Sequence, residues 1–169
     1  MSNRTFIFPG QGSQFVGMGK SLLENNLDYF ADHLEVIKDV CGEQFLELMF
    51  NGPEEKLNIT INTQPALFIA SAFVSDLLKD KGVNPDFVAG HSLGEYSALY
   101  AAEVFGFKAG LEMVKTRAEM MNDAVPAGKG TMAAVIGLSP EKIENIAETS
   151  CFEIANYNNS GQTIISGEK

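Results

Sequence analysis

The sequence has few of the residues from which proteins build disulfide frameworks and metal sites. It contains two cysteines, Cys41 and Cys151, and two histidines, His33 and His91. The cysteines lie far apart, form no C-x-x-C pair and have apolar neighbours, so we expect two buried, reduced thiols. Without a cluster of cysteine and histidine, we expect no metal site.

Long apolar runs and an excess of basic residues are also missing. No run reaches the roughly 18 residues that a membrane span requires, and Pro9 and Gly10 interrupt the opening residues too early for a signal peptide. Acidic residues outnumber basic ones by 22 to 12, for a net charge of −10, which disfavours binding to polyanions. We therefore expect a soluble, cytoplasmic protein without a nucleic-acid or membrane partner.

The length and the order of patterns indicate the fold class. A chain of 169 residues, 45% of them hydrophobic, predicts one compact domain or one domain with a small appendage. Up to about residue 125, strands alternate with helical patterns, which is typical of an α/β fold with a parallel sheet. After Gly130 the order is strand, helix, strand, strand, as in most of a split βαβ sandwich. We predict a boundary between residues 1–127 and 128–169.

The spacing of apolar residues, prolines and glycines predicts the elements. A helical pattern from Phe30 to Met49 is divided by Gly42. Residues 65–79 form a predicted helix with Thr63 as its N-cap and Gly82 beyond its end. Further strands are expected over residues 5–8, 87–89, 132–136, 152–155 and 163–166. Further helices are expected over residues 95–102, over 108–122 with Pro126 and Gly128 closing it, and from Pro140 with Ser139 as its N-cap.

Residues 90–94, Gly-His-Ser-Leu-Gly, match the pattern G-x-S-x-G between a predicted strand and a predicted helix. So sharp a turn forces the serine into a strained backbone conformation, and side chains two residues to either side would collide. The turn exposes the Ser92 hydroxyl at a helix N-terminus, where N–H groups and the helix dipole stabilise negative charge. We predict that Ser92 is a nucleophile. The alternative is an ordinary helix N-cap between two packing glycines.

A nucleophilic serine needs a base, and the sequence offers little. His91 directly precedes Ser92, so its side chain should point away from the hydroxyl, and His33 is expected to be a partly exposed helical residue. No histidine follows Ser92. Gly10 and Gly12 follow the first strand, but a dinucleotide-binding pattern would need glycine where Phe15 stands, so we expect no cofactor.

Several motifs, in this order, resemble one family, the malonyl-CoA:acyl-carrier-protein transacylases of bacterial fatty-acid synthesis, which are related to the acyltransferase domains of polyketide synthases. They are FPGQGSQ at 8–14, TQPAL at 63–67, GHSLGEYSA at 90–98, Arg117, and GTMAA at 130–134. The resemblance is collinear from Phe6 to Gly167. It implies an α/β-hydrolase-like large subdomain with a parallel sheet and a nucleophile elbow, and part of a ferredoxin-like small subdomain.

The resemblance also implies a reaction. The serine matching Ser92 takes the malonyl group from CoA as an ester and passes it to the phosphopantetheine thiol of acyl carrier protein. No cofactor takes part, because malonyl-CoA is a substrate. Gln11 and the backbone N–H of Leu93 would form the oxyanion hole.

Three further residues would contact or adjoin the substrate by the same resemblance: Arg117, Gln64 and His91. Arg117 would bind the malonyl carboxylate, because a guanidinium fork pairs both oxygens at once. On residue type alone, a solvated surface arginine is the favoured interpretation of Arg117. Gln64 would lie near the site. Whether the acyl group is malonyl or methylmalonyl stays open.

The second half of the family pattern, with its catalytic histidine, is absent from this sequence. A shortened chain, a partial gene product and a natural short form all explain this. We expect a poorly active chain that exposes a sheet edge and apolar faces and self-associates through them. The rival functions are a non-catalytic remnant that binds CoA or the carrier protein, and a serine esterase. The esterase would need a histidine after Ser92. Lys115 and Lys129 are local candidates for docking an acidic carrier protein.

Overall fold

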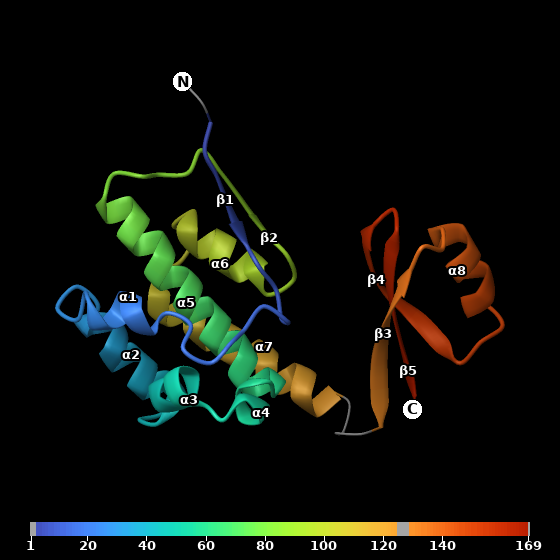
Figure 1. Ribbon diagram of the computed structural model, residues 1–169, viewed down its shortest axis with the longest axis horizontal. Coiled ribbons are helices and arrows are strands. Elements are labelled where there is room, and N and C mark those ends of the chain that lie inside the picture. The colour runs from blue at the N-terminus through green and yellow to red at the C-terminus, as the bar shows by residue number, and fades with distance from the viewer. Residues whose placement is uncertain (1–2, 125–128, 169) are drawn as a thin grey trace. The chain divides into compact units, whose positions relative to one another are not determined.

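The computed structural model describes residues 3–124 and 129–168, which fall into two compact units, Met1–Met121 and Asn122–Lys169 (Figure 1). The predicted boundary between residues 127 and 128 lies outside the described residues, as do Pro126 and Gly128, and these stay predictions. Each unit is described by itself.

The sheet of the first unit is a parallel pair of short strands. Strand β1 (Thr5–Phe8) pairs with β2 (Phe87–Gly90), Thr5 opposite Phe87 and Phe8 opposite Gly90. Phe6, Phe8 and Val88 pack on one face with helix α6, while Ile7 and Phe87 are 77% and 58% exposed. The predicted parallel α/β arrangement is confirmed, and both strands deliver their carboxyl ends to the same edge of the sheet.

The first unit has seven described helices, of which α6 contacts both strands. They are α1 (Lys20–Glu24), α2 (Ala31–Cys41), α3 (Phe45–Asn51), α4 (Glu54–Leu57), α5 (Thr60–Asp80), α6 (Gly94–Ala101) and α7 (Phe107–Ala124). The predicted division at Gly42 is confirmed, since α2 ends at Cys41 and Gly42 has a φ of +94°. Figure 1 shows α5 crossing the unit, and it contacts α1, α4 and α6.

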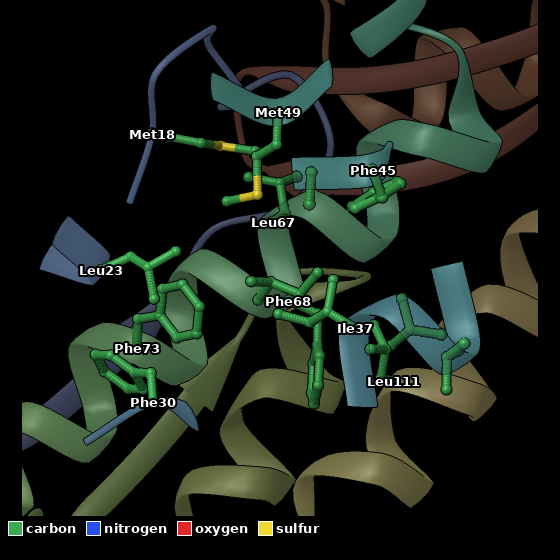
Figure 2. Close-up of a cluster of buried hydrophobic side chains, with 14 of the residues drawn as sticks. Met18, Leu23, Phe30, Ile37, Phe45, Met49, Leu67, Phe68, Phe73 and Leu111 are labelled. Carbon is green, nitrogen blue, oxygen red and sulfur yellow. The ribbon is translucent and has the colours of Figure 1, made fainter. Parts of the chain in front are cut away.

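The core of the first unit lies around the middle of α5, which is apolar on nearly all sides. Phe68 and Phe73 are fully buried there, and the Phe73 and Phe30 rings lie 4.3 Å apart (Figure 2). Ile37 and Leu111 bring α2 and α7 against the same cluster. Burial of these aromatic and aliphatic side chains is the main favourable contribution to the stability of such a unit.

Helix α5 begins at Thr60, so the predicted start at Pro65 with Thr63 as the N-cap is wrong. Thr63 is fully buried inside the helix, and its hydroxyl donates to the carbonyls of Leu57 and Ile59, 2.6 and 3.1 Å away. Pro65 lies inside the helix, at its sixth residue, so it has no amide to donate to the Ile61 carbonyl and one bond of the helix is missing there. Gly82, with a φ of +73°, follows the helix end as predicted.

The second unit is a three-stranded antiparallel sheet with one helix. Its elements are β3 (Gly130–Ile136), α8 (Pro140–Ala147), β4 (Phe152–Asn159) and β5 (Gln162–Glu168). Strand β5 lies between β3 and β4. The predicted order strand, helix, strand, strand is confirmed, and Ser139 is the N-cap of α8 with Pro140 at its first position.

The two cysteines differ in exposure. Cys41 is partly buried against the core, and this burial raises the pKa of its thiol to about 11. Cys151 is exposed, so the prediction of two buried thiols is wrong for this residue. Cys151 immediately precedes β4, which is an edge strand of the sheet. Apolar neighbours in the sequence therefore do not bury its side chain.

Candidate active site

The turn between β2 and α6 has the strained geometry predicted from G-x-S-x-G. Ser92 has a φ of +53°, which is rare for a residue with a side chain. A Cβ at Gly90 would collide with the backbone of Gly94 and Glu95, and one at Gly94 would collide with the backbone of Phe8. Both glycines are therefore required by space, and the turn leaves Ser92 exposed.

The backbone around Ser92 leaves a donor at the helix start. The N–H groups of Gly94, Glu95 and Tyr96 each donate to the carbonyl three residues earlier. Across residues 3–124 and 129–168, no acceptor is found for the N–H of Leu93, the N-cap of α6. The Leu93 side chain is fully buried and anchors that turn.

Helix α7 brings Arg117 to the serine. The guanidinium Nη2 donates to Ser92 Oγ at 3.0 Å, and Nη1 donates to Gln64 Oε1 at 2.7 Å. The guanidinium carbon also lies 5.9 Å from the centre of the Tyr96 ring, within cation–π range. Arg117 is partly buried, and its guanidinium lies beside the Ser92 hydroxyl instead of extending into solvent.

Two glutamines complete the cluster. Gln64, on the first turns of α5, is fully buried, and its Nε2 donates to the Met121 sulfur at 3.3 Å and to Gln11 Oε1 at 3.5 Å. Gln11, in the loop after β1, donates through Nε2 to Thr60 Oγ1 at 3.1 Å. The structure therefore brings Gln11, Gln64, Ser92 and Arg117 together from four segments of the chain.

Thr60, Tyr96 and Met121 contact these residues and were not predicted as part of the site. Met121 lies four residues after Arg117, on the same face of α7. That spacing is a signal the sequence contains, but a methionine four residues after an arginine is too common to point to a site by itself.

The two histidines lie in different surroundings. The His91 backbone N–H donates to the Phe8 carbonyl at 3.1 Å, and its Nδ1 would lie 2.8 Å from a Cβ at Gly10, so the imidazole lies against that loop. His33 contacts Asp76 Oδ2 through Nε2 at 3.0 Å. Tyr100 donates to the same oxygen at 2.7 Å, and burial together with Asp76 raises the pKa of Tyr100. His33 thus belongs to a structural cluster in the core, with side-chain exposure of 18%.

Within the part of the chain that the structure describes, the only side chain found to hydrogen-bond the Ser92 hydroxyl is Arg117, which cannot accept a proton. No three His, Cys, Asp or Glu side chains among the described residues are grouped so that they could hold a metal ion. None of the described helices is long and apolar enough to cross a membrane.

A family model described as "Acyl transferase domain" matches residues 5–169. The chain belongs to the acyl transferase family. It is 44% identical over 172 residues to the malonyl CoA-acyl carrier protein transacylase of Bacillus subtilis (strain 168), covering 99% of this chain and 54% of that protein. The corresponding Staphylococcus aureus (strain COL) protein is 43% identical over 174 residues, covering 100% of this chain and 56% of its own.

The solved structures that resemble this chain belong to proteins of the same kind. An acyl-carrier-protein-S-malonyltransferase from Bartonella henselae superposes with a TM-score of 0.88 at 42% identity, over 99% of this chain and 55% of that chain. A malonyl-transacylase in complex with a type II PKS acyl-carrier protein gives a TM-score of 0.87 at 40% identity, over 99% and 56%. The chain thus spans about half the length of the relatives it matches.

Proposed function

We propose that the chain is an acyltransferase that moves a malonyl group from CoA to the phosphopantetheine thiol of acyl carrier protein, in fatty-acid synthesis, through an ester on Ser92. The observation that carries the proposal is the contact of the Arg117 guanidinium with Ser92 Oγ at 3.0 Å. The exposed serine can accept an acyl group, and the guanidinium beside it can pair with a carboxylate at the other end of that group.

The reaction has two steps. Ser92 Oγ attacks the thioester carbon of malonyl-CoA, the C–S bond breaks, and the hydroxyl proton passes through a base to the CoA sulfur. The phosphopantetheine sulfur then attacks the ester carbon, the C–O bond to Ser92 breaks, and the thiol proton returns to Oγ. The donor and the product are both thioesters and the acceptor is a thiol, so the transfer exchanges one thioester for another and needs no cofactor.

Charge develops on the carbonyl oxygen in both steps, and the Leu93 N–H is proposed to receive it together with Gln11. Leu93 is the N-cap of α6, and the helix dipole favours negative charge at this end of the helix. Gln11 lies in the loop after β1, next to Gln64. These two donors come from different segments, so the oxyanion hole depends on the β1–β2 pairing.

Arg117 is proposed to bind the malonyl carboxylate. An unpaired carboxylate in a partly dry site is costly, and the guanidinium offers planar N–H donors that a lysine lacks. His91 is proposed to line the substrate side of the loop at Gly10, because its ring lies against that loop.

Turnover by this chain is expected to be slow, because the described residues supply no base to Ser92. Loss of the base in a serine-based site lowers kcat by roughly 10⁴- to 10⁶-fold. The same observation favours a second candidate function, a remnant that binds CoA or the carrier protein without transfer.

We further propose that the first unit is part of an α/β-hydrolase-like subdomain and the second part of a ferredoxin-like one, in a cytoplasmic protein. The exposed Ile7 and Phe87 face of the sheet supports self-association. An apolar cavity of about 440 Å³ between β1 and α5, lined in part by Phe15 and Val74, adds to this surface.

Transfer of malonyl from malonyl-CoA to holo acyl carrier protein, read by the mass of the carrier protein, tests the proposal. We expect slow transfer that disappears in Ser92→Ala and is weaker from acetyl-CoA. Binding of malonyl-CoA without any transfer would favour the non-catalytic remnant. Faster hydrolysis of a simple aryl ester than transfer of malonyl would favour an esterase.

A further inference from the structure

The buried amide of Gln64 has all of its observed side-chain partners inside the candidate site. Its carbonyl accepts from Arg117 Nη1 at 2.7 Å, and its amide nitrogen donates to the Met121 sulfur at 3.3 Å and to Gln11 Oε1 at 3.5 Å. The side chain has no exposed surface. A group so enclosed is poorly placed to contact a substrate and well placed to orient its neighbours.

The chemistry of these partners allows only one orientation of the amide. Arginine has donors and no acceptor, so the Gln64 oxygen must face Arg117. The thioether sulfur and the Gln11 oxygen are acceptors, so the Gln64 nitrogen must face them. A flipped amide would turn its NH₂ group toward the guanidinium and lose every one of these bonds.

Helix α7 connects the two ends of this arrangement. Arg117 and Met121 are four residues apart on one helix face, and Gln64 from α5 lies against both. Because Nη1 donates to Gln64, the guanidinium cannot rotate freely. Nη2 therefore stays directed toward Ser92 Oγ, 3.0 Å away.

We propose that Gln64 is a positioning residue and does not bind the substrate itself. Gln64 holds the guanidinium of Arg117 so that the remaining N–H donors of Arg117 point toward the carboxylate of an acyl group whose carbonyl lies at Ser92. Met121 in turn orients the Gln64 amide. The identity of that carboxylate rests on the proposed function, whereas the restraint on Arg117 does not.

Nitrogen-15 NMR of the Arg117 guanidinium in the full chain tests the restraint without any activity. We expect separate, slowly exchanging Nη signals in the unaltered protein and their merging in Gln64→Leu, because the acceptor for Nη1 is gone. Gln64→Glu restores an acceptor oxygen and should keep the signals separate. Unchanged Nη signals in Gln64→Leu would overturn the proposal.

Affinities for malonyl-CoA and acetyl-CoA, measured by calorimetry in a Ser92→Ala background, test the consequence for the ligand. In Gln64→Leu the preference for malonyl-CoA should fall about tenfold, the loss of one charge-assisted bond, while acetyl-CoA affinity stays unchanged. Gln64→Glu should also lose the preference, because its carboxylate pairs with Arg117 in place of the ligand.

Met121→Leu keeps the volume, removes the sulfur acceptor, and is available if Gln64→Leu fails to fold. A roughly two- to threefold loss of preference is expected, with Met120→Leu, at an exposed neighbouring position, as the unaffected control. An unchanged preference in both Gln64→Leu and Met121→Leu would contradict the positioning role. Equal binding of the two thioesters by the chain with Gln64 intact would contradict the proposed function, while the Nη spectra still decide the restraint.

Discussion

Helix α5 contains two buried segments of opposite chemistry, and the comparison between them explains how the site is held. Around Phe68 and Phe73 the helix is buried by apolar side chains (Figure 2). One to two turns earlier, Thr63 and Gln64 are equally buried, and their polar atoms are paired with named partners. The apolar segment requires volume, whereas the polar segment requires specific acceptors and donors. Substitutions in the first should therefore change stability through lost volume. Those in the second should act through lost hydrogen bonds, at Thr63 on stability and at Gln64 on the geometry of the site.

Phe73→Ala breaks the apolar segment and should have the largest effect on stability. The side chain is fully buried against Phe30, so its removal leaves a cavity and should lower the free energy of unfolding by about 3–5 kcal/mol. Urea denaturation measures this. Val74→Ala, where the side chain is 45% exposed, is the matched control and should cost less than about 1 kcal/mol. Equal effects would contradict the assigned core.

Cys41 tests how well the apolar region excludes water. Its thiol pKa is raised from 9.0 to about 11 by burial, so at pH 8 roughly 100-fold less thiolate is present than for an ordinary cysteine. Iodoacetamide should therefore modify the exposed Cys151 first, as read by peptide mass. The folded protein favours the neutral thiol, so its stability is fully present below pH 9. As the pH rises from 9 toward 11, the thiol of the unfolded chain ionises first and the free energy of unfolding falls. Rapid modification of Cys41 at pH 8 would contradict its burial.

Thr63→Val tests the polar segment of α5 by removing a buried hydroxyl. The shape is kept, but the Leu57 carbonyl loses a buried partner, which should lower the free energy of unfolding by about 1–3 kcal/mol. Thr116→Val on α7 removes a similar bond, to the Glu112 carbonyl, at an exposed position and should have little effect. The two variants are compared by thermal unfolding, and indistinguishable midpoints would count against the buried bond.

Ser92→Gly should give the smallest change and the opposite sign. Glycine adopts a φ of +53° without strain, so the free energy of unfolding should rise by about 1 kcal/mol while acylation is lost. Glu103→Gly removes strain at a φ of +61° away from the site. It also removes the ion pair with Lys79, so it should give a smaller gain, without loss of acylation. A destabilised Ser92→Gly would mean that the bond to Arg117 outweighs the strain.

The elements that depend on local patterns were predictable from the sequence. Gly90 and Gly94 flank a turn that backbone collisions impose, Gly42 divides a helical pattern, and Gly82 ends one. These follow from steric rules within a few residues of the chain, and the structure confirms them.

The features that depend on distant partners were not predictable. The start of α5 was misplaced because Thr63 resembles an N-cap until its bond to the Leu57 carbonyl is known. The resemblance places Gln64 near the site, but its contacts with Arg117 and Met121, 53 and 57 residues away, cannot be read from spacing. The exposure of Cys151 likewise depends on what the second unit leaves uncovered.

The most direct test of the central claim is the intact mass of the chain before and after exposure to malonyl-CoA, with the modified residue located by peptide mapping. The account predicts one malonyl group per chain, attached to Ser92 and absent from Ser92→Ala. A folded chain that binds malonyl-CoA yet gains no mass, or that carries the group on another residue, would contradict it.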